Sequence, residues 1–270
     1  MGNVIKIAED VSAVVDLVEI DGRVSWVPAG ATGYEPYNTY LIESDEALLV
    51  VDPGMPAHWK SVHAAISDQL RGRRLVVFNT RSELECIANL GRLLDSFDTV
   101  QTVTSCPLNP FDLVHRREPG RMHPPSAYVG FRETLADFGF PHLHSFRPVI
   151  KMLGTSWLYD ARGKVLFSTD CFGGDYLSGP DDALVRDTLK GAPPPERLRA
   201  AMLAKFDWLE QADMPIMRKL WDGFFDDLDI HVLAPTHGRI QSGADVVGTV
   251  LASYRSALLE PEDAGLVNVS

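Results

Sequence analysis

Side chains that could carry chemistry follow three β-rich runs of the sequence, at 79–86 (NTRSELEC), 168–174 (STDCFGG) and 235–240 (PTHGRI). Each segment begins where a buried-strand pattern ends, and that edge is where open α/β folds place their sites. Carboxylate, thiolate and imidazole groups are ligands for zinc and iron. An acidic cluster with one histidine is costly to bury without a cation. The candidate metal ligands are therefore Glu83, Glu85, Cys86, Asp170 and His237.

A metal-free interpretation of the same residues stays open. The acids of Glu-x-Glu-Cys are also typical of the first turn of a helix, where the helix dipole favours negative charge. Cys86 then serves as a small buried apolar residue. Asp170 and His237 become a hydrogen-bonded pair of turn residues.

The elements that must position these side chains are indicated by hydrophobic periodicity and turn signals. Strands are predicted at 14–20, 24–28, 37–44, 47–52, 74–80, 100–104, near 149, and at 157–159, 165–168 and 230–235. Helices are predicted at 58–70, 82–97, 127–138, 196–211, 217–228 and 244–259. This order predicts an α/β fold in which helices pack on two sheets.

Length and composition exclude several classes of protein. The 270 residues are expected to form one domain, 1–270, with an irregular loop rich in proline, arginine and histidine at about 105–126. A net charge of −12 argues against nucleic acid and anionic membranes as partners. Three cysteines without CxxC spacing, no apolar run of membrane-spanning length and no signal-like start lead us to expect a cytoplasmic location.

Several motifs resemble successive landmarks of the metallo-β-lactamase fold. They are YNTYLI at 37–42, ALLVVDPG at 47–54, the 79–86 segment, VLFSTDCFGG at 165–174 and VLAPTHGRI at 232–240. Within that superfamily, the chain is most similar to the flavodiiron and oxygen-binding diiron proteins. The resemblance implies an αβ/βα sandwich of two mixed sheets flanked by helices. It also implies that Asp52 supports the site structurally.

The sequence departs from the hallmark of that subgroup, His-x-Glu-x-Asp-His followed by a later histidine, a bridging aspartate and a final histidine. Arg81 stands at the first histidine, Glu85 at the aspartate and Cys86 at the last histidine of the motif. The intermediate histidine has no counterpart near Met152. The resemblance therefore implies that the usual two-metal site cannot form.

A single metal position remains in this comparison. Glu85, Cys86, Asp170 and His237 would hold one zinc or iron ion, or none if the metal-free interpretation applies. We expect Arg81 to pair with Glu83 and Asp170 and to supply the charge of the first metal. His142 and His144, two residues apart on one strand face, could lend a replacement ligand.

Three functions follow from these expectations. The first is a metal-dependent hydrolase of a small molecule, in which one ion activates water and Asp170 or Glu83 acts as the general base. The second is an oxygen-binding or redox-active iron protein of flavodiiron type without the flavodoxin domain. The third is a catalytically inactive subunit or sensor that partners an active paralogue. Aromatic residues on the late helices favour a homo-oligomer or a hetero-oligomer with a related subunit.

Overall fold

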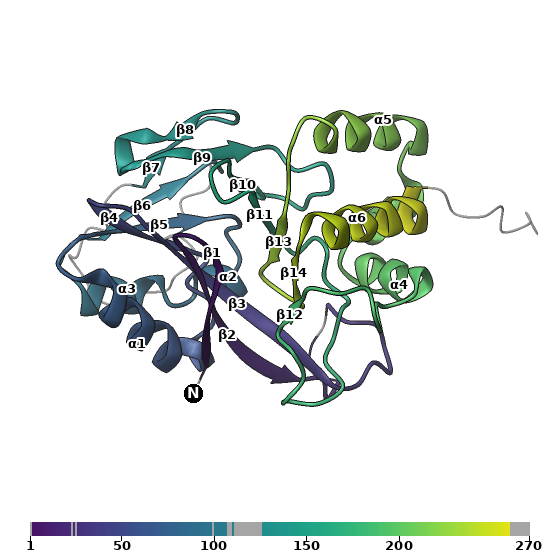
Figure 1. Ribbon diagram of the computed structural model, residues 1–270, viewed down its shortest axis with the longest axis horizontal. Coiled ribbons are helices and arrows are strands. Elements are labelled where there is room, and N and C mark those ends of the chain that lie inside the picture. The colour runs from purple at the N-terminus through teal and green to yellow at the C-terminus, as the bar shows by residue number, and fades with distance from the viewer. Residues whose placement is uncertain are drawn as a thin grey trace, which may run out of the picture.

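Two seven-stranded sheets form the centre of the molecule (Figure 1). The computed structural model describes residues 2–22, 24, 26–98, 100–106, 110 and 126–259. The expected loop at 105–126 therefore lies largely outside the described residues. Within the described residues, no helix combines the length and apolarity that crossing a membrane requires.

The first sheet is mixed and follows the chain order. Its strands are β1 (Asn3–Ala8), β2 (Val11–Glu19), β3 (Tyr34–Glu43), β4 (Ala47–Val51), β5 (Arg74–Asn79), β6 (Val100–Thr104) and β7 (Ala127–Tyr128). The pairs from β1 to β4 are antiparallel, and those from β4 to β7 are parallel. The carboxyl ends of β4 and β5 therefore lie at the same edge of this sheet.

The second sheet has the order β12-β14-β13-β11-β10-β9-β8. Its strands are β8 (Thr134–Leu135), β9 (Phe140–Phe146), β10 (Trp157–Asp160), β11 (Val165–Thr169), β12 (Val185–Arg186), β13 (Val232–Pro235) and β14 (Ile240–Ser242). β11 and β13 are parallel, so the segments that follow them leave the sheet at one edge.

Helices cover the two outer faces, as Figure 1 shows. The helices on the first sheet are α1 (Trp59–Leu70) and α3 (Leu90–Ser96), with the short α2 (Leu84–Ile87) between β5 and α3. Those on the second sheet are α4 (Pro195–Lys205), α5 (Met214–Phe225) and α6 (Ala244–Leu259). The 3-10 turns are η1 (Pro56–His58), η3 (Ala136–Phe138) and η4 (Asp207–Gln211).

Apolar side chains from both sheets meet between them and form the main core, which includes Tyr40, Phe78, Leu158 and Phe167. Almost continuous apolar runs in β4, β5 and β11 are buried on both faces, as expected for strands covered on two sides. The predicted αβ/βα sandwich is confirmed.

Five predicted elements are wrong or interrupted. No strand forms near 149, which lies in a bend after β9 ends at Phe146, and the helix expected at 196–211 is divided into α4 and η4 at Phe206. The described residues of 24–28 form no strand, and 127–138 forms β7, β8 and a 3-10 turn because Thr134 and Leu135 pair with β9. The helix expected at 82–97 is interrupted at Asn89, whose buried side-chain amide donates hydrogen bonds to the carbonyls of Pro53 and Met55. This interruption separates α2, which carries Glu85, from α3.

Candidate metal centre

The two sheets meet at the ends of β5, β11 and β13. The backbone N–H of Ser156 donates to the carbonyl of Thr80 at 2.7 Å, and Arg81 forms a β-bridge with Thr155. The N–H of Thr236 donates to the carbonyl of Thr169, also at 2.7 Å. These links between strand ends fix where the segments with Arg81, Asp170 and His237 can project.

Asp52 ties three of these strand ends together. Its Oδ1 accepts the backbone N–H of Thr80 at 2.9 Å, and its Oδ2 accepts the hydroxyls of Thr80 at 2.5 Å and Thr236 at 3.0 Å. Asp52 itself adopts a left-handed conformation, with φ of 53°, directly after β4. Burial raises the pKa of its carboxyl group to about 6, even though these donors act in the opposite direction. The contacts give Asp52 the supporting role that the resemblance implies.

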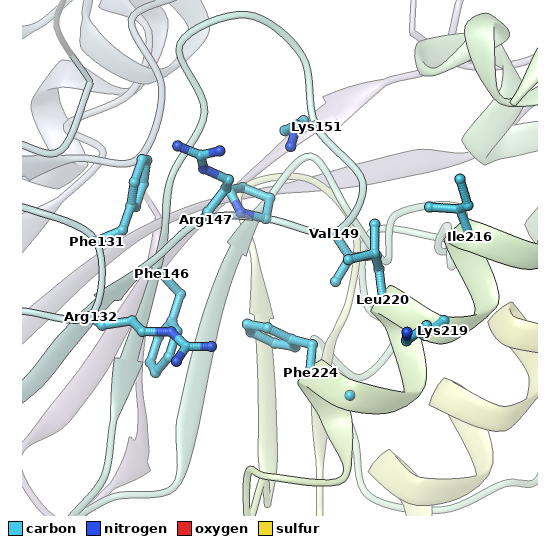
Figure 2. A pocket seen from close by; sticks show the side chains of 12 residues that line it. Phe131, Arg132, Phe146, Arg147, Val149, Lys151, Ile216, Lys219, Leu220 and Phe224 are labelled. Atoms are coloured by element: carbon cyan, nitrogen blue, oxygen red, sulfur yellow. The ribbon is translucent and has the colours of Figure 1, made fainter. Parts of the chain in front are cut away.

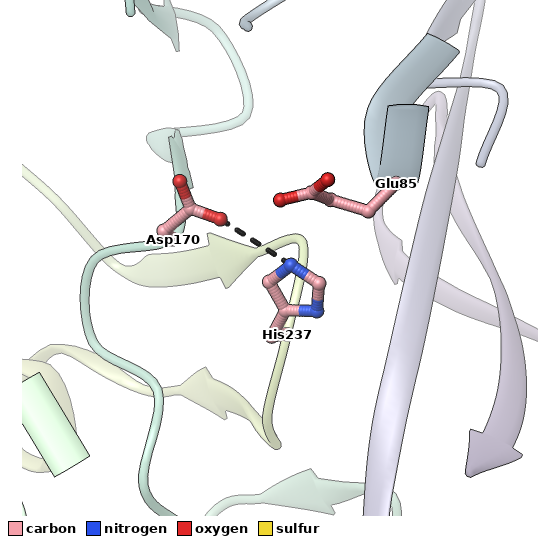
Figure 3. A group of neighbouring side chains, drawn as sticks. All are labelled: Glu85, Asp170 and His237. Carbon is pink, nitrogen blue, oxygen red and sulfur yellow. Dashed lines mark ion pairs between the residues drawn. The ribbon is translucent and has the colours of Figure 1, made fainter. Parts of the chain in front are cut away.

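Three candidate ligands converge at the end of the second sheet. One ligand atom each of Glu85, Asp170 and His237 lies within 4.8 Å of the other two, and Figure 3 shows the three side chains pointing toward a common centre. Nε2 of His237 lies 3.3 Å from Oδ1 of Asp170. Among the described residues, this group is the part of the predicted ligand set that could hold a metal ion.

Cys86 and Glu83 lie outside this converging group, and their roles as ligands stay predictions. The Cys86 side chain is fully buried, and burial raises the pKa of its thiol well above its ordinary value. In the absence of a metal ion, such a neutral thiol packs as a small apolar side chain. Glu83 is the residue just before α2, and its carboxylate pairs with Arg81.

Arg81 is almost completely buried, with 1% of its side chain exposed. One terminal nitrogen of its guanidinium group donates to Oδ2 of Asp170, and the other donates to Oε1 of Glu83. A planar guanidinium group suits two carboxylates at once and stays charged at any physiological pH. The side chain that replaces the first histidine of the motif thus supplies a fixed positive charge.

Lys205, at the end of α4, is the site residue that sequence reasoning missed. Its Nζ donates to Oε1 of Glu85 at 2.9 Å and lies 3.6 Å from Oδ1 of Asp170 and 3.8 Å from Oε2 of Glu83. The ammonium group also lies over the ring of Trp26, 5.4 Å from its centre. A lysine in the last turn of a helix is ordinarily explained by the helix dipole, so no local pattern identifies it.

Five charged side chains therefore form one group, which we call the ion-pair cluster: Arg81, Glu83, Glu85, Asp170 and Lys205. Three carboxylates face two cations, which leaves a net charge of −1 when the neighbouring imidazole is neutral. Burial raises the pKa of Asp170, but His237, Lys205 and Arg81 act against burial and hold this pKa well below its ordinary value. The carboxylates thus have counter-charges that side chains of the protein itself supply.

Aromatic and acidic side chains enclose the imidazole of His237. Its ring centre lies 4.3 Å from that of Tyr37 and 4.7 Å from that of Trp26. The indole N–H of Trp26 donates to Glu35 at 2.7 Å, and burial raises the pKa of this glutamate. The cavity beside these residues and Lys205 has a volume of about 20 Å³. That is room for about one water molecule, not for an organic substrate.

The expected replacement ligands lie elsewhere. His144 is paired with Tyr159, which in turn pairs with Leu166 of β11. His142 lies further than His144 from the carboxyl end of β11. Its Nε2 is 3.9 Å from Oδ1 of Asp160. Because Asp170 follows the opposite end of β11, neither histidine belongs to the converging group.

Two metal ions do not fit this set of side chains. The motif positions that would supply nitrogen ligands hold Arg81, which is bound to carboxylates, and Cys86, which is buried. A single ion could use Glu85, Asp170 and His237, but the ammonium group of Lys205 already binds the first and contacts the second. An ion at this position requires Lys205 to move away.

Solved structures of flavodiiron proteins are similar to this chain. It aligns with a metal-soaked flavodiiron core from Synechocystis with a TM-score of 0.72 and 17% identity, over 95% of this chain and 60% of that one. It aligns with rubredoxin oxygen:oxidoreductase from Desulfovibrio gigas with a TM-score of 0.68 and 17% identity, over 93% of this chain and 60% of that one. For a flavodiiron protein from Giardia intestinalis, the TM-score is 0.68 and the identity 18%, over 95% of this chain and 59% of that one.

The chain spans about 60% of the length of the Synechocystis and Desulfovibrio chains. No protein-family model matches it, and neither does any curated protein sequence. The predicted resemblance is confirmed at the level of architecture, because similarity at this identity establishes the fold alone. The chain has the metallo-β-lactamase-like fold of flavodiiron cores.

Proposed function

We propose that this protein is a flavodiiron-like core in which the ion-pair cluster takes the place of the two metal ions, and that it works as a non-catalytic subunit or sensor beside a metal-bearing relative. The observation that carries the proposal is the position of Lys205, 2.9 Å from Glu85 and 3.6 Å from Asp170. A metal ion on the same carboxylates would be repelled by this ammonium group. The two cannot share the site.

Retention of the surrounding scaffold supports the same proposal. Asp52 still joins the strand ends through Thr80 and Thr236, and His237 keeps its place beside Asp170. The residues that would support a metal centre are thus retained, while Arg81 and Lys205 balance the negative charge of the carboxylates. The cavity of about 20 Å³ argues against the hydrolase that the sequence analysis expects, because a small-molecule substrate needs far more space.

A second candidate is a redox protein with one iron ion. The convergence of Glu85, Asp170 and His237 within 4.8 Å favours it, since two carboxylates and an imidazole are ligands that iron accepts. The flavodiiron and oxygen:oxidoreductase names of similar structures also favour iron over hydrolytic chemistry. This candidate requires that Lys205 leave its three carboxylates when iron binds.

Anaerobic reconstitution with ferrous iron separates the two candidates. After desalting, iron is measured by elemental mass spectrometry, and dioxygen consumption is followed with a chemical reductant. We expect less than stoichiometric iron and no dioxygen consumption beyond that of the reductant alone. One retained iron that is lost in Asp170→Asn, together with dioxygen consumption, would support the second candidate. Two irons per chain would refute both candidates.

A further inference from the structure

Two neighbouring cavities border the segment 146–155, and the first of them also borders α5. The first, of about 790 Å³, lies between α5 on one side and residues 131–132 and 146–151 on the other (Figure 2). The second, of about 700 Å³, shares Phe131, Arg147 and Lys151 with the first. We call the two together the α5 groove. Each of the two cavities alone is in the size range of small-molecule sites.

The wall of the groove is apolar. Phe146 and Phe224 lie with their ring centres 5.6 Å apart, and Val149 is buried next to them. Ile216 and Leu220, one turn apart on α5, are 56% and 52% exposed. Figure 2 shows these side chains grouped around the same opening. Covering them would remove apolar surface from water, which is favourable at roughly 25 cal/mol per Å².

Four cations surround this apolar surface: Arg132, Arg147, Lys151 and Lys219. Within the described residues, none of them forms an ion pair with a carboxylate, and no acidic side chain lines either cavity. The guanidinium group of Arg147 lies over the ring of Phe131, 5.2 Å from its centre. Burial, followed by the charge of Arg147, lowers the pKa of Lys151. Among the described residues, positive charge therefore accumulates here without a carboxylate partner, in a chain whose net charge is −12.

We propose that the α5 groove binds an amphipathic anion, an apolar carboxylate of fatty-acid size, with its chain along Val149, Leu220 and Phe224 and its carboxylate among the four cations. A carboxylate would supply the missing counter-charge, and Arg147 offers the planar donor pair that binds carboxylates best. A nucleotide is a poorer match, because the lining provides few polar groups besides the cations. This inference does not depend on the function proposed for the ion-pair cluster.

The test is titration calorimetry of the full chain with laurate, and with dodecanol as the neutral compound of the same chain length. We expect laurate to bind with one site and dodecanol to bind about tenfold more weakly or not at all. Raising the salt concentration should weaken laurate binding, because the cations are exposed to solvent. Equal binding of the two compounds would overturn the proposal, and so would no binding of laurate.

Variants assign the binding to this groove. The double variant Arg147→Glu/Lys151→Glu should weaken laurate binding by about a hundredfold, because it reverses both charges shared by the two cavities. Leu220→Ser should weaken it less. Lys60→Glu reverses an exposed charge on α1 and should leave binding unchanged. Thermal unfolding checks that every variant is folded.

Two results would contradict the assignment. Unchanged laurate binding in the folded double variant would place the ligand elsewhere. A concentration-dependent dimer that Leu220→Ser dissociates, with no laurate binding by the monomer, would make this face an interface between two copies of the chain.

Discussion

The ion-pair cluster and the α5 groove both concentrate charge, but they do so in opposite ways. In the cluster, each of the five charged groups lies within 4 Å of an opposite charge, and Arg81 and Asp170 are nearly inaccessible to solvent. In the groove, four exposed cations have no carboxylate partner among the described residues. Buried charge that is fully paired is part of the folded structure, whereas exposed charge of one sign around an apolar surface is free for recognition.

The largest effect is expected from Asp170→Ala in the ion-pair cluster. The substitution leaves the guanidinium group of Arg81 buried without one of its two carboxylates and removes a contact of Lys205. Breaking a buried ion pair from one side costs about 3 to 5 kcal/mol of unfolding free energy. Urea denaturation measures this cost. In the groove, Lys151→Ala serves as the matched control and should change stability by less than about 0.5 kcal/mol. Similar losses of unfolding free energy in Asp170→Ala and Lys151→Ala would contradict the proposed difference between a structural ion-pair cluster and a recognition groove.

Asp52 extends the comparison, because it is a buried carboxylate that forms no ion pair among the described residues. Burial raises its pKa from 3.8 to about 6 in the folded protein. The folded state therefore keeps a proton that the unfolded chain has already released, so this contribution to stability is complete below about pH 4 and is lost as the pH rises through 6. The shift corresponds to about 3 kcal/mol.

The isosteric variant Asp52→Asn carries no titratable group and should lack this part of the pH dependence. Unfolding free energies of the wild-type protein and the variant, measured from about pH 4 to pH 7, give the difference directly. We expect the wild-type protein to lose stability relative to the variant across this range. Parallel curves would show that Asp52 is not protonated in the folded protein.

An α/β fold with helices on two sheets was predictable from local patterns, and the resemblance to the metallo-β-lactamase fold implied the αβ/βα sandwich. Apolar runs at 47–51, 74–79 and 165–169, each with turn residues after it, predict buried strands whose ends carry the site. The motifs around Asp170 and His237 predict where those segments meet. Arg81 was placed by the resemblance, which aligns it with the first histidine of the motif, and its pairing with Glu83 and Asp170 is confirmed.

Other parts of the site were not predictable from local patterns. Lys205 is 120 residues from Glu85 in the chain, and only the packing of α4 on the second sheet brings the two within hydrogen-bond distance. The burial of Cys86 is likewise a property of the packing around α2, not of the Glu-x-Glu-Cys motif, and its role as a ligand stays a prediction. Glu35 looks like an ordinary strand residue, yet it lies fully buried beside Trp26.

The most direct test of the ion-pair cluster is a zinc titration of the wild-type protein and Lys205→Met, read by competition with a chromogenic chelator. Removing the ammonium group frees Glu85 and Asp170 to act with His237, so the account predicts one zinc per chain in the variant and none in the wild-type protein. The control Lys164→Met, which removes the exposed pair with Asp229, should behave like the wild-type protein. Two zinc ions bound by the wild-type protein, or none bound by Lys205→Met, would contradict the account.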